Sequence, residues 1–422
     1  MRQTQPALAA DSALVRDILA FAAPGSATLH ERAEGIDYFV NAFWTAGQRQ
    51  AHAIHEISYR ACFKPQLPEF FISRLTAPGD LVFDPFMGRG TTPLQAALMG
   101  RRAGGNDISG LGVMMCRPRL RPVGPDAVEA ALRRVDWSRG AVRRPELLAF
   151  YHPATLARLE ALRDWIDARA PPGDDRPDPV ADWIRMVALN RLAGHSPGFF
   201  SGRSMPPNQA VSVASQLRIN ARLGLAPPER DIAALILRKS RALLRDGMMP
   251  GGAVLGGAHP CLFTGPAWDI PLEAGAVALA VTSPPFLDVV DYAADNWLRC
   301  WFAGLDAGAA ALGQHRGAAG WMAMIRRALA ELARLVRPGG HVAFEVGEVR
   351  GGRILLERQV WQAAAGLPFE RLGVLVNRQL FTKTSNCWGV SNFTRGTNSN
   401  RVVLLRRNGG GGQSIIRSDG VI

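Results

Sequence analysis

LVFDPFMGRGTT, from Leu81 to Thr92, decides the fold class of this 422-residue chain. Its first four residues read as a buried parallel strand, and Gly88 and Gly90 then allow the backbone to turn tightly before a helix. We expect Thr92 to cap that helix and Pro93 to lie in its first turn. A glycine turn between a strand and a helix presents bare backbone N–H groups. The stretch therefore predicts an α/β sheet with a cofactor site.

The two glycines do not form a dinucleotide-binding motif. Such a motif needs Gly-x-Gly-x-x-Gly, and Pro93 stands where the third glycine belongs. FDPFMGRGTT instead resembles the S-adenosylmethionine motif of amino-group DNA methyltransferases, which usually has Ser where this chain has Arg89. The resemblance implies that the following residues of the motif bind the cofactor: Asp84, Phe86, Gly88, Gly90 and Thr91.

A second motif, VTSPPF, runs from Val281 to Phe286 and continues an apolar run that begins at Val277. It therefore lies at the carboxyl end of another buried strand, where open α/β sheets bind ligands. A Pro-Pro pair alone usually marks a rigid loop. Together with the first motif, Ser-Pro-Pro-aromatic resembles the catalytic motif of the same methyltransferases, and Ser at the first position favours cytosine N4 over adenine N6. The resemblance implies four catalytic residues: Ser283, Pro284, Pro285 and Phe286.

The segment upstream of the first motif, HEISYRACFKPQLPEFF from His55 to Phe71, also resembles these enzymes. In them, aromatic and basic residues at this place cover the methionine part of the cofactor. The resemblance implies this role for Tyr59 and Lys64, with surface packing as the alternative.

An acidic residue, Asp107, ends the expected second strand, which runs from Ala103 to Asp107. Asp107 comes 17 residues after Gly90, close to the ~20 typical of an acid that binds ribose hydroxyls. A cap or turn aspartate is the alternative, but NDIS also resembles the family pattern. A further short strand is expected at Leu262 to Thr264, and after it the family often has an acid that contacts the adenine amino group. This chain has Pro266 there, so either Asp269 substitutes or the contact is absent.

The composition favours a polyanionic partner. The formal charge is +13 with a pI near 10.6, and Lys64, Lys239 and Lys383 are the only lysines, so arginine carries almost all of the positive charge. Double-stranded DNA fits this balance. Five scattered cysteines suggest neither a disulfide framework nor a metal site. With no run long enough to span a membrane, we expect a cytoplasmic protein.

Almost two hundred residues separate the two motifs, far more than one crossover needs, and their apolar stripes predict a helical insertion over 123–250 for target recognition. In the loop His195 to Gln209, Arg203 and Asn208 are candidates for reading base edges, with an irregular structural turn as the alternative. On the helix expected around Glu229 to Arg245, one face is basic and carries Arg230, Arg238, Arg241 and Arg245. We expect phosphate contacts from this face, with a solvated surface as the alternative.

The order of cofactor motif, long insertion and Ser-Pro-Pro-Phe motif resembles the alpha class of amino methyltransferases, and this resemblance implies a Rossmann-like methyltransferase sheet with a helical insertion. The expected parts are a helical N-terminal extension (1–75), two parts of the methyltransferase domain (76–122 and 251–408), the insertion, and a flexible tail (409–422). The expected activity is methyl transfer from S-adenosylmethionine to cytosine N4 in DNA. The alternatives are an adenine-N6 enzyme, an RNA or protein methyltransferase, and a non-catalytic DNA-binding protein. No acidic-x-Lys nuclease element occurs, so any restriction endonuclease partner would be a separate polypeptide.

Overall fold

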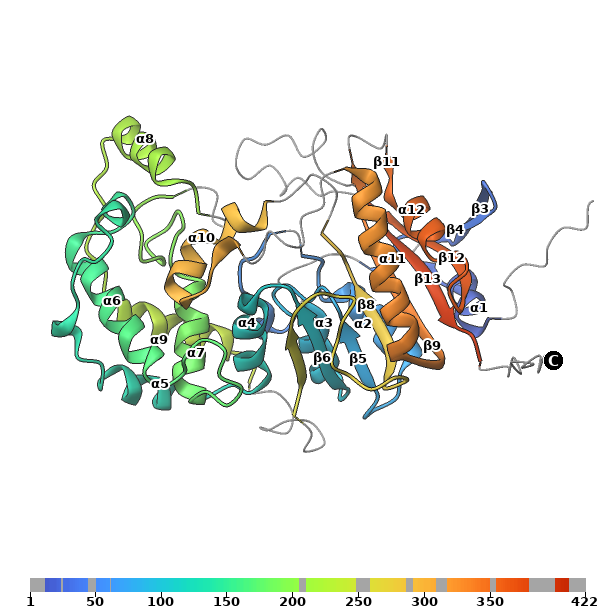
Figure 1. Ribbon diagram of the computed structural model, residues 1–422, viewed down its shortest axis with the longest axis horizontal. Coiled ribbons are helices and arrows are strands. Elements are labelled where there is room, and N and C mark those ends of the chain that lie inside the picture. The colour runs from blue at the N-terminus through green and yellow to red at the C-terminus, as the bar shows by residue number, and fades with distance from the viewer. Residues whose placement is uncertain are drawn as a thin grey trace, which may run out of the picture.

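The computed structural model describes residues 12–23, 26–44, 51–60, 62–204, 210–247, 259–285, 291–308, 317–349, 354–378 and 399–409. Figure 1 shows a sheet flanked by helices, with a group of helices beside it.

In the described part of the chain the sheet has nine strands, in the order β3-β4-β12-β13-β9-β8-β5-β6-β7. From β9 to β7 all neighbours are parallel, whereas β13 is antiparallel to both β9 and β12. This mixed, mostly parallel sheet confirms the predicted Rossmann-like fold. The strands are β3 (Leu29–Ala33), β4 (Ile36–Asn41), β5 (Leu81–Asp84), β6 (Arg102–Asp107), β7 (Cys261–Thr264), β8 (Val277–Thr282), β9 (Val336–Val346), β12 (Phe369–Arg378) and β13 (Ser399–Arg407).

The central strands β5 and β8 are apolar except for Asp84 and Thr282 at their carboxyl ends, because helices cover both faces. Every residue of β5 and β8 is buried. Leu81 and Phe83 pack into a cluster with α11 (Ala318–Leu335) and α12 (Leu356–Ala363). Val82 points the other way, into a cluster with α1 (Ala13–Ala20) and α2 (Gln66–Leu75). The continuous apolar runs therefore mark strands buried on two sides, as the sequence predicted.

The chain leaves β5 in one direction and returns on its other side. β6 and β7 lie to one side of β5, and β8 and β9 lie to the other. Loops that leave the carboxyl ends of β5 and β8 therefore diverge, which opens a crevice where such sheets bind ligands. Both sequence motifs lie at this switch point.

The described residues between β6 and β7 are largely helical, as predicted, and Figure 1 shows these helices beside the sheet. Their core is shared with α10 (Tyr292–Ala303), which follows the second motif, and with Ile54 and Ile57 of the N-terminal part. The helix α10, the insertion and the N-terminal segment around Ile54 are thus packed together. The helix α4 (Gly110–Leu120) precedes the insertion. The helices of the insertion are α5 (Pro125–Leu132), α6 (Pro153–Asp167), α7 (Pro179–Leu189), α8 (Val213–Leu223) and α9 (Ile232–Leu243).

The prediction that residues 1–75 are helical is wrong for residues 29–41. These form the hairpin β3–β4, and β4 adds to the sheet edge with Phe39 paired to Leu375 of β12. Glu34 and Gly35 both have positive φ (52° and 77°), the conformation of a tight two-residue hairpin turn. Tertiary pairing with β12 outweighs the helix-compatible spacing of the aromatic residues.

The predicted cap at Thr92 is also wrong. The N-cap of α3 (Thr91–Leu98) is Gly90, in the left-handed conformation with φ 79°. Thr92 lies inside the helix, and its hydroxyl donates to the Val281 carbonyl at 3.0 Å. Thr92 therefore ties the helix of the first motif to the strand of the second.

Candidate functional site

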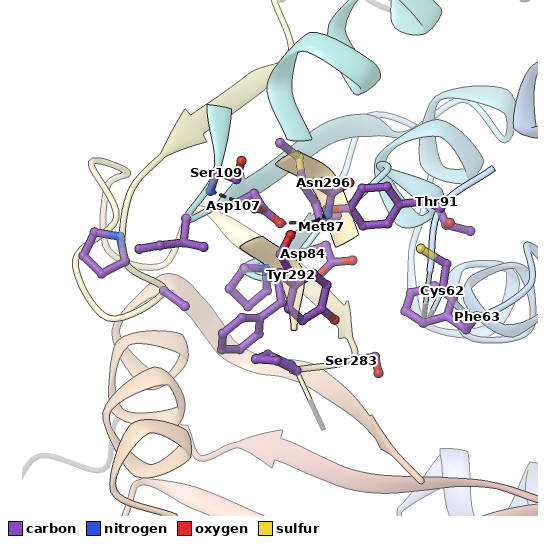
Figure 2. Close-up of a pocket in the computed structure, with 18 of the residues that line it drawn as sticks. Cys62, Phe63, Asp84, Met87, Thr91, Asp107, Ser109, Ser283, Tyr292 and Asn296 are labelled. Atoms are coloured by element: carbon purple, nitrogen blue, oxygen red, sulfur yellow. Dashed lines mark hydrogen bonds between the residues drawn. The ribbon is translucent and has the colours of Figure 1, made fainter. Parts of the chain in front are cut away.

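A pocket lies at the carboxyl ends of β5, β6 and β8, with about 1020 Å³ of empty space including the open solvent at its mouth. Figure 2 shows Asp84 and Asp107 near the centre of the pocket and Ser283 below them. The structure thus brings both motifs to one site. The predicted residues that line it are Tyr59, Asp84, Phe86, Gly88, Thr91, Asp107, Ser283 and Pro285.

Asp107 is the last residue of β6 and connects this strand to the glycine turn. One carboxylate oxygen accepts the Gly88 N–H at 2.9 Å, and the other accepts the Ser109 N–H at 2.9 Å. Burial raises the pKa of Asp107 to about 6, although these two hydrogen bonds oppose the rise. The residue therefore organises a turn and also faces the pocket.

Asp84 is 1% exposed and forms the end of β5. Its Oδ1 accepts the Phe86 N–H at 3.0 Å and the Thr282 hydroxyl at 2.6 Å, so it links β5 to β8. Burial raises the pKa of Asp84 to about 7. Among the described residues no basic side chain forms an ion pair with Asp84 or Asp107. A positively charged ligand would offset the cost of these two buried carboxylates.

Tyr59, Cys62 and Phe63 form one wall of the pocket. The Tyr59 ring packs against the glycine turn, where a Cβ built on Gly88 would lie 3.5 Å from it. Burial raises the pKa of the Tyr59 hydroxyl well above its usual range. Lys64 does not line the pocket, and burial lowers its pKa.

Two other predicted residues support the site without lining it. Gly90 packs against α4, and a Cβ there would come within 2.4 Å of Cys116 Sγ. Pro284 is buried between the lining residues Ser283 and Pro285. Phe286 lies outside the described residues.

The strand β7 leads into the pocket through an apolar turn. Pro266, Ala267 and Trp268 line the pocket, whereas Asp269 is exposed and does not. Asp269 therefore does not take the place of the acid that this chain lacks.

The predicted DNA-contacting arginines lie on the helical part, away from the pocket. Arg203 and Arg238 are exposed, and Asn208 lies outside the described residues. Arg241 lies 3.6 Å from Glu129, and Arg245 forms a two-hydrogen-bond ion pair with Glu56 at 2.9 and 2.5 Å. Arg241 and Arg245 therefore have acidic partners on the protein surface.

Several site residues were missed from the sequence. Trp321 of α11 donates its Nε1–H to the Pro285 carbonyl at 2.7 Å, which fixes the second motif. Glu345 of β9 is buried, and burial raises its pKa, while hydrogen bonds from Ser283 and from Asn400 (3.0 Å) oppose the rise. An acid inside the apolar run HVAFEV was a signal for such a role. Trp321 gave no signal, because its helical spacing is that of a core residue.

The described residues contain no group of three or more His, Cys, Asp or Glu side chains that could hold a metal ion. No helix in the described ranges is long and apolar enough to cross a membrane.

Residues 27–110 match the model of the DNA methylase family, which confirms the expected resemblance to amino-group DNA methyltransferases. The chain is 40% identical to the Type II methyltransferase M.MjaII of Methanocaldococcus jannaschii over 73 residues. These residues make up 17% of this chain and 13% of that relative's length.

Solved structures give weaker similarity. TrmN from Thermus thermophilus has 14% identity, covers 82% of this chain and 50% of that chain, and has a TM-score of 0.32. A putative DNA modification methylase from Thermus thermophilus, TTHA0409, complexed with S-adenosyl-L-methionine, has 20% identity, covers 33% and 51%, and has a TM-score of 0.20. These TM-scores are too low to carry an argument about function.

Proposed function

We propose that this chain, a DNA methylase by family over residues 27–110, transfers a methyl group from S-adenosylmethionine to the exocyclic N4 of cytosine in double-stranded DNA. One observation carries the proposal. The glycine turn with Asp84 and Asp107 shares a single pocket with Ser283 and Pro285 of the second motif. A methyl donor and a methyl acceptor held by these two motifs would therefore meet.

The pocket suits this cofactor in shape and charge. Asp107 would accept hydrogen bonds from the ribose hydroxyls, and Tyr59 and Phe63 would cover the methionine part. The two buried carboxylates favour a ligand that carries positive charge, as a sulfonium does. When bound, the cofactor supplies an activated methyl group, and the protein contributes position and electrostatics.

Ser283 and the Pro284 carbonyl would act on the target amino group. Its lone pair is delocalised into the base, so hydrogen-bond acceptors must draw the amino hydrogens out of the base plane before the nitrogen attacks. The Ser283 hydroxyl donates to the Glu345 carboxylate, which leaves its oxygen lone pairs to accept an amino hydrogen. Trp321 holds the neighbouring Pro285 carbonyl and so restricts the loop.

The target base would have to leave the duplex, at an unstacking cost of a few kcal/mol. Phe286 would stack on the base, and Arg203, Asn208, Arg238 and Arg241 of the insertion would contact DNA. Arg245 would do so only after releasing Glu56.

Mass spectrometry of nucleosides tests the reaction. Purified protein, cofactor and unmethylated duplex DNA are expected to yield N4-methylcytosine, and Ser283→Ala protein serves as the control. N6-methyladenine would instead identify an adenine enzyme, and label found only in RNA or protein would change the substrate class. A protein that binds DNA but neither binds cofactor nor modifies any base would be the non-catalytic alternative.

A further inference from the structure

Residues 53–60 and 62–64, which we call the strap, connect the cofactor pocket to the helical part. Apart from a short 3-10 turn at Ala53–His55, the described part of the strap has no regular structure. Side chains from distant elements satisfy many of its backbone groups, as buried polar groups require. The strap also carries Tyr59, Cys62 and Phe63 of the pocket wall.

Arg89 holds the strap from the cofactor side. Its side chain is 4% exposed, and it donates to the Ile57 carbonyl at 2.7 Å and to the Phe63 carbonyl at 3.5 Å. Arg119 of α4 donates to the Ile54 carbonyl at 3.2 Å. The residue that replaces the usual Ser of the first motif thus fixes the segment that faces it.

The helical part holds the strap from the opposite side. Lys239 of α9 donates its Nζ–H to the Glu56 carbonyl at 2.7 Å. Asn190, at the end of α7, accepts the Ser58 N–H at 3.1 Å, and Asp246 accepts the Ala53 N–H at 2.7 Å. Three side chains of the helical part therefore bind the strap backbone.

The two sets of contacts meet on successive residues. Lys239 binds the carbonyl of Glu56, and Arg89 binds that of Ile57. Two residues further on, the Tyr59 ring packs against Gly88. Loss of the Lys239 contact would loosen the strap at Glu56, three residues before Tyr59.

We propose that Lys239, a residue of the helical insertion, is a positioning residue for the cofactor and acts through the strap. This inference rests on the proposed cofactor. Lys239 lies on the inner side of α9, whereas its neighbour Arg238 is exposed. Its role is therefore distinct from the phosphate contacts proposed for the basic face.

The test compares Lys239→Met with Lys239→Arg and with Arg222→Met. Arg222 is an exposed cation on α8, so the last variant loses one charge elsewhere on the helical part. Titration calorimetry of the full chain with S-adenosylmethionine, without DNA, is expected to give a Kd about 10-fold higher for Lys239→Met, as loss of a charge-assisted hydrogen bond implies. The other two variants should stay within about 2-fold of wild type, because Arg keeps the donor and Arg222 is remote.

Two further readouts separate positioning from general damage. Hydrogen exchange of strap amides in the cofactor-free Lys239→Met protein should be faster than in wild type, while amides of β5 and β8 stay unchanged. In the Lys239→Met protein the KM for the cofactor should rise by a larger factor than the factor by which kcat at saturating cofactor falls. Should Lys239→Met fail to fold, Asn190→Ala removes a separate contact to the strap and is expected to weaken the cofactor in the same direction.

The outcomes distinguish the inference from the function. Wild-type protein that does not bind S-adenosylmethionine would overturn the proposed function. Wild-type protein that binds it, with Lys239→Met or Asn190→Ala equal to Arg222→Met in affinity and strap exchange, would overturn the inference alone.

Discussion

Replacement of Asp84 by Asn should stabilise the cofactor-free protein at high pH and have little effect at low pH. Asp84 is fully buried without a basic partner among the described residues, and burial raises its pKa from 3.8 to about 7. Asn keeps an oxygen that can accept from the Phe86 N–H and the Thr282 hydroxyl. The substitution therefore removes the ionisation and retains the two hydrogen bonds.

The sign of the effect follows from proton binding. Between pH values of about 4 and 7 the folded protein keeps a proton on Asp84 that the unfolded chain has released, so the stability contributed by this group falls as the pH rises. Between about pH 5 and about pH 8, wild-type protein should lose about 2 to 3 kcal/mol of stability from this group. The loss builds up over the roughly two pH units between pH 5 and the folded pKa of about 7.

Urea unfolding at about pH 5 and about pH 8 measures this difference. The free energy of unfolding of Asp84→Asn minus that of wild type should rise by about 2 to 3 kcal/mol between the two conditions. Asp107→Asn is a matched control with a smaller expected rise, because the pKa of Asp107 reaches only about 6. The raised pKa of Asp84 would be refuted if the two proteins differed in stability by the same amount at both pH values. It would also be refuted if the variant were less stable than wild type at the higher pH.

Ser283→Ala should abolish most turnover and leave cofactor binding intact, since Ser283 is proposed to hold the base; lost cofactor affinity in calorimetry would count against this role. Asp107→Ala should weaken the cofactor by the ~1.5–3 kcal/mol of a charge-assisted hydrogen bond, and an unchanged Kd would end the ribose proposal. Reversal of Arg238 and Arg241 to Glu should weaken DNA binding uniformly across sequences and flatten its salt dependence, whereas an effect confined to the specific site would mean base reading. Unmethylated plasmid incubated with the protein, magnesium and cofactor should become methylated and stay uncut, so that any restriction endonuclease is a separate chain; reproducible double-strand breaks would contradict this.

Local pattern determined the framework of this protein. Apolar runs at Leu81–Asp84 and Val277–Thr282 are buried strands because each is covered on both faces, which requires no polar alternation. The glycine turn and the Ser-Pro-Pro motif follow those strands directly. Because carboxyl ends of parallel strands share one edge, their meeting in a pocket was predictable from the sequence.

Tertiary structure decided what depends on partners far away in the chain. Phe39 has spacing compatible with a helix, and only pairing with Leu375 makes its segment a strand. Arg89 is an unexplained departure from the first motif until the strap carbonyls surround it. Lys239 looks like one more cation on a basic helix, and only the fold places it against Glu56. A local sequence pattern specifies which face of an element is buried, but the atoms that meet that face are set by packing between elements.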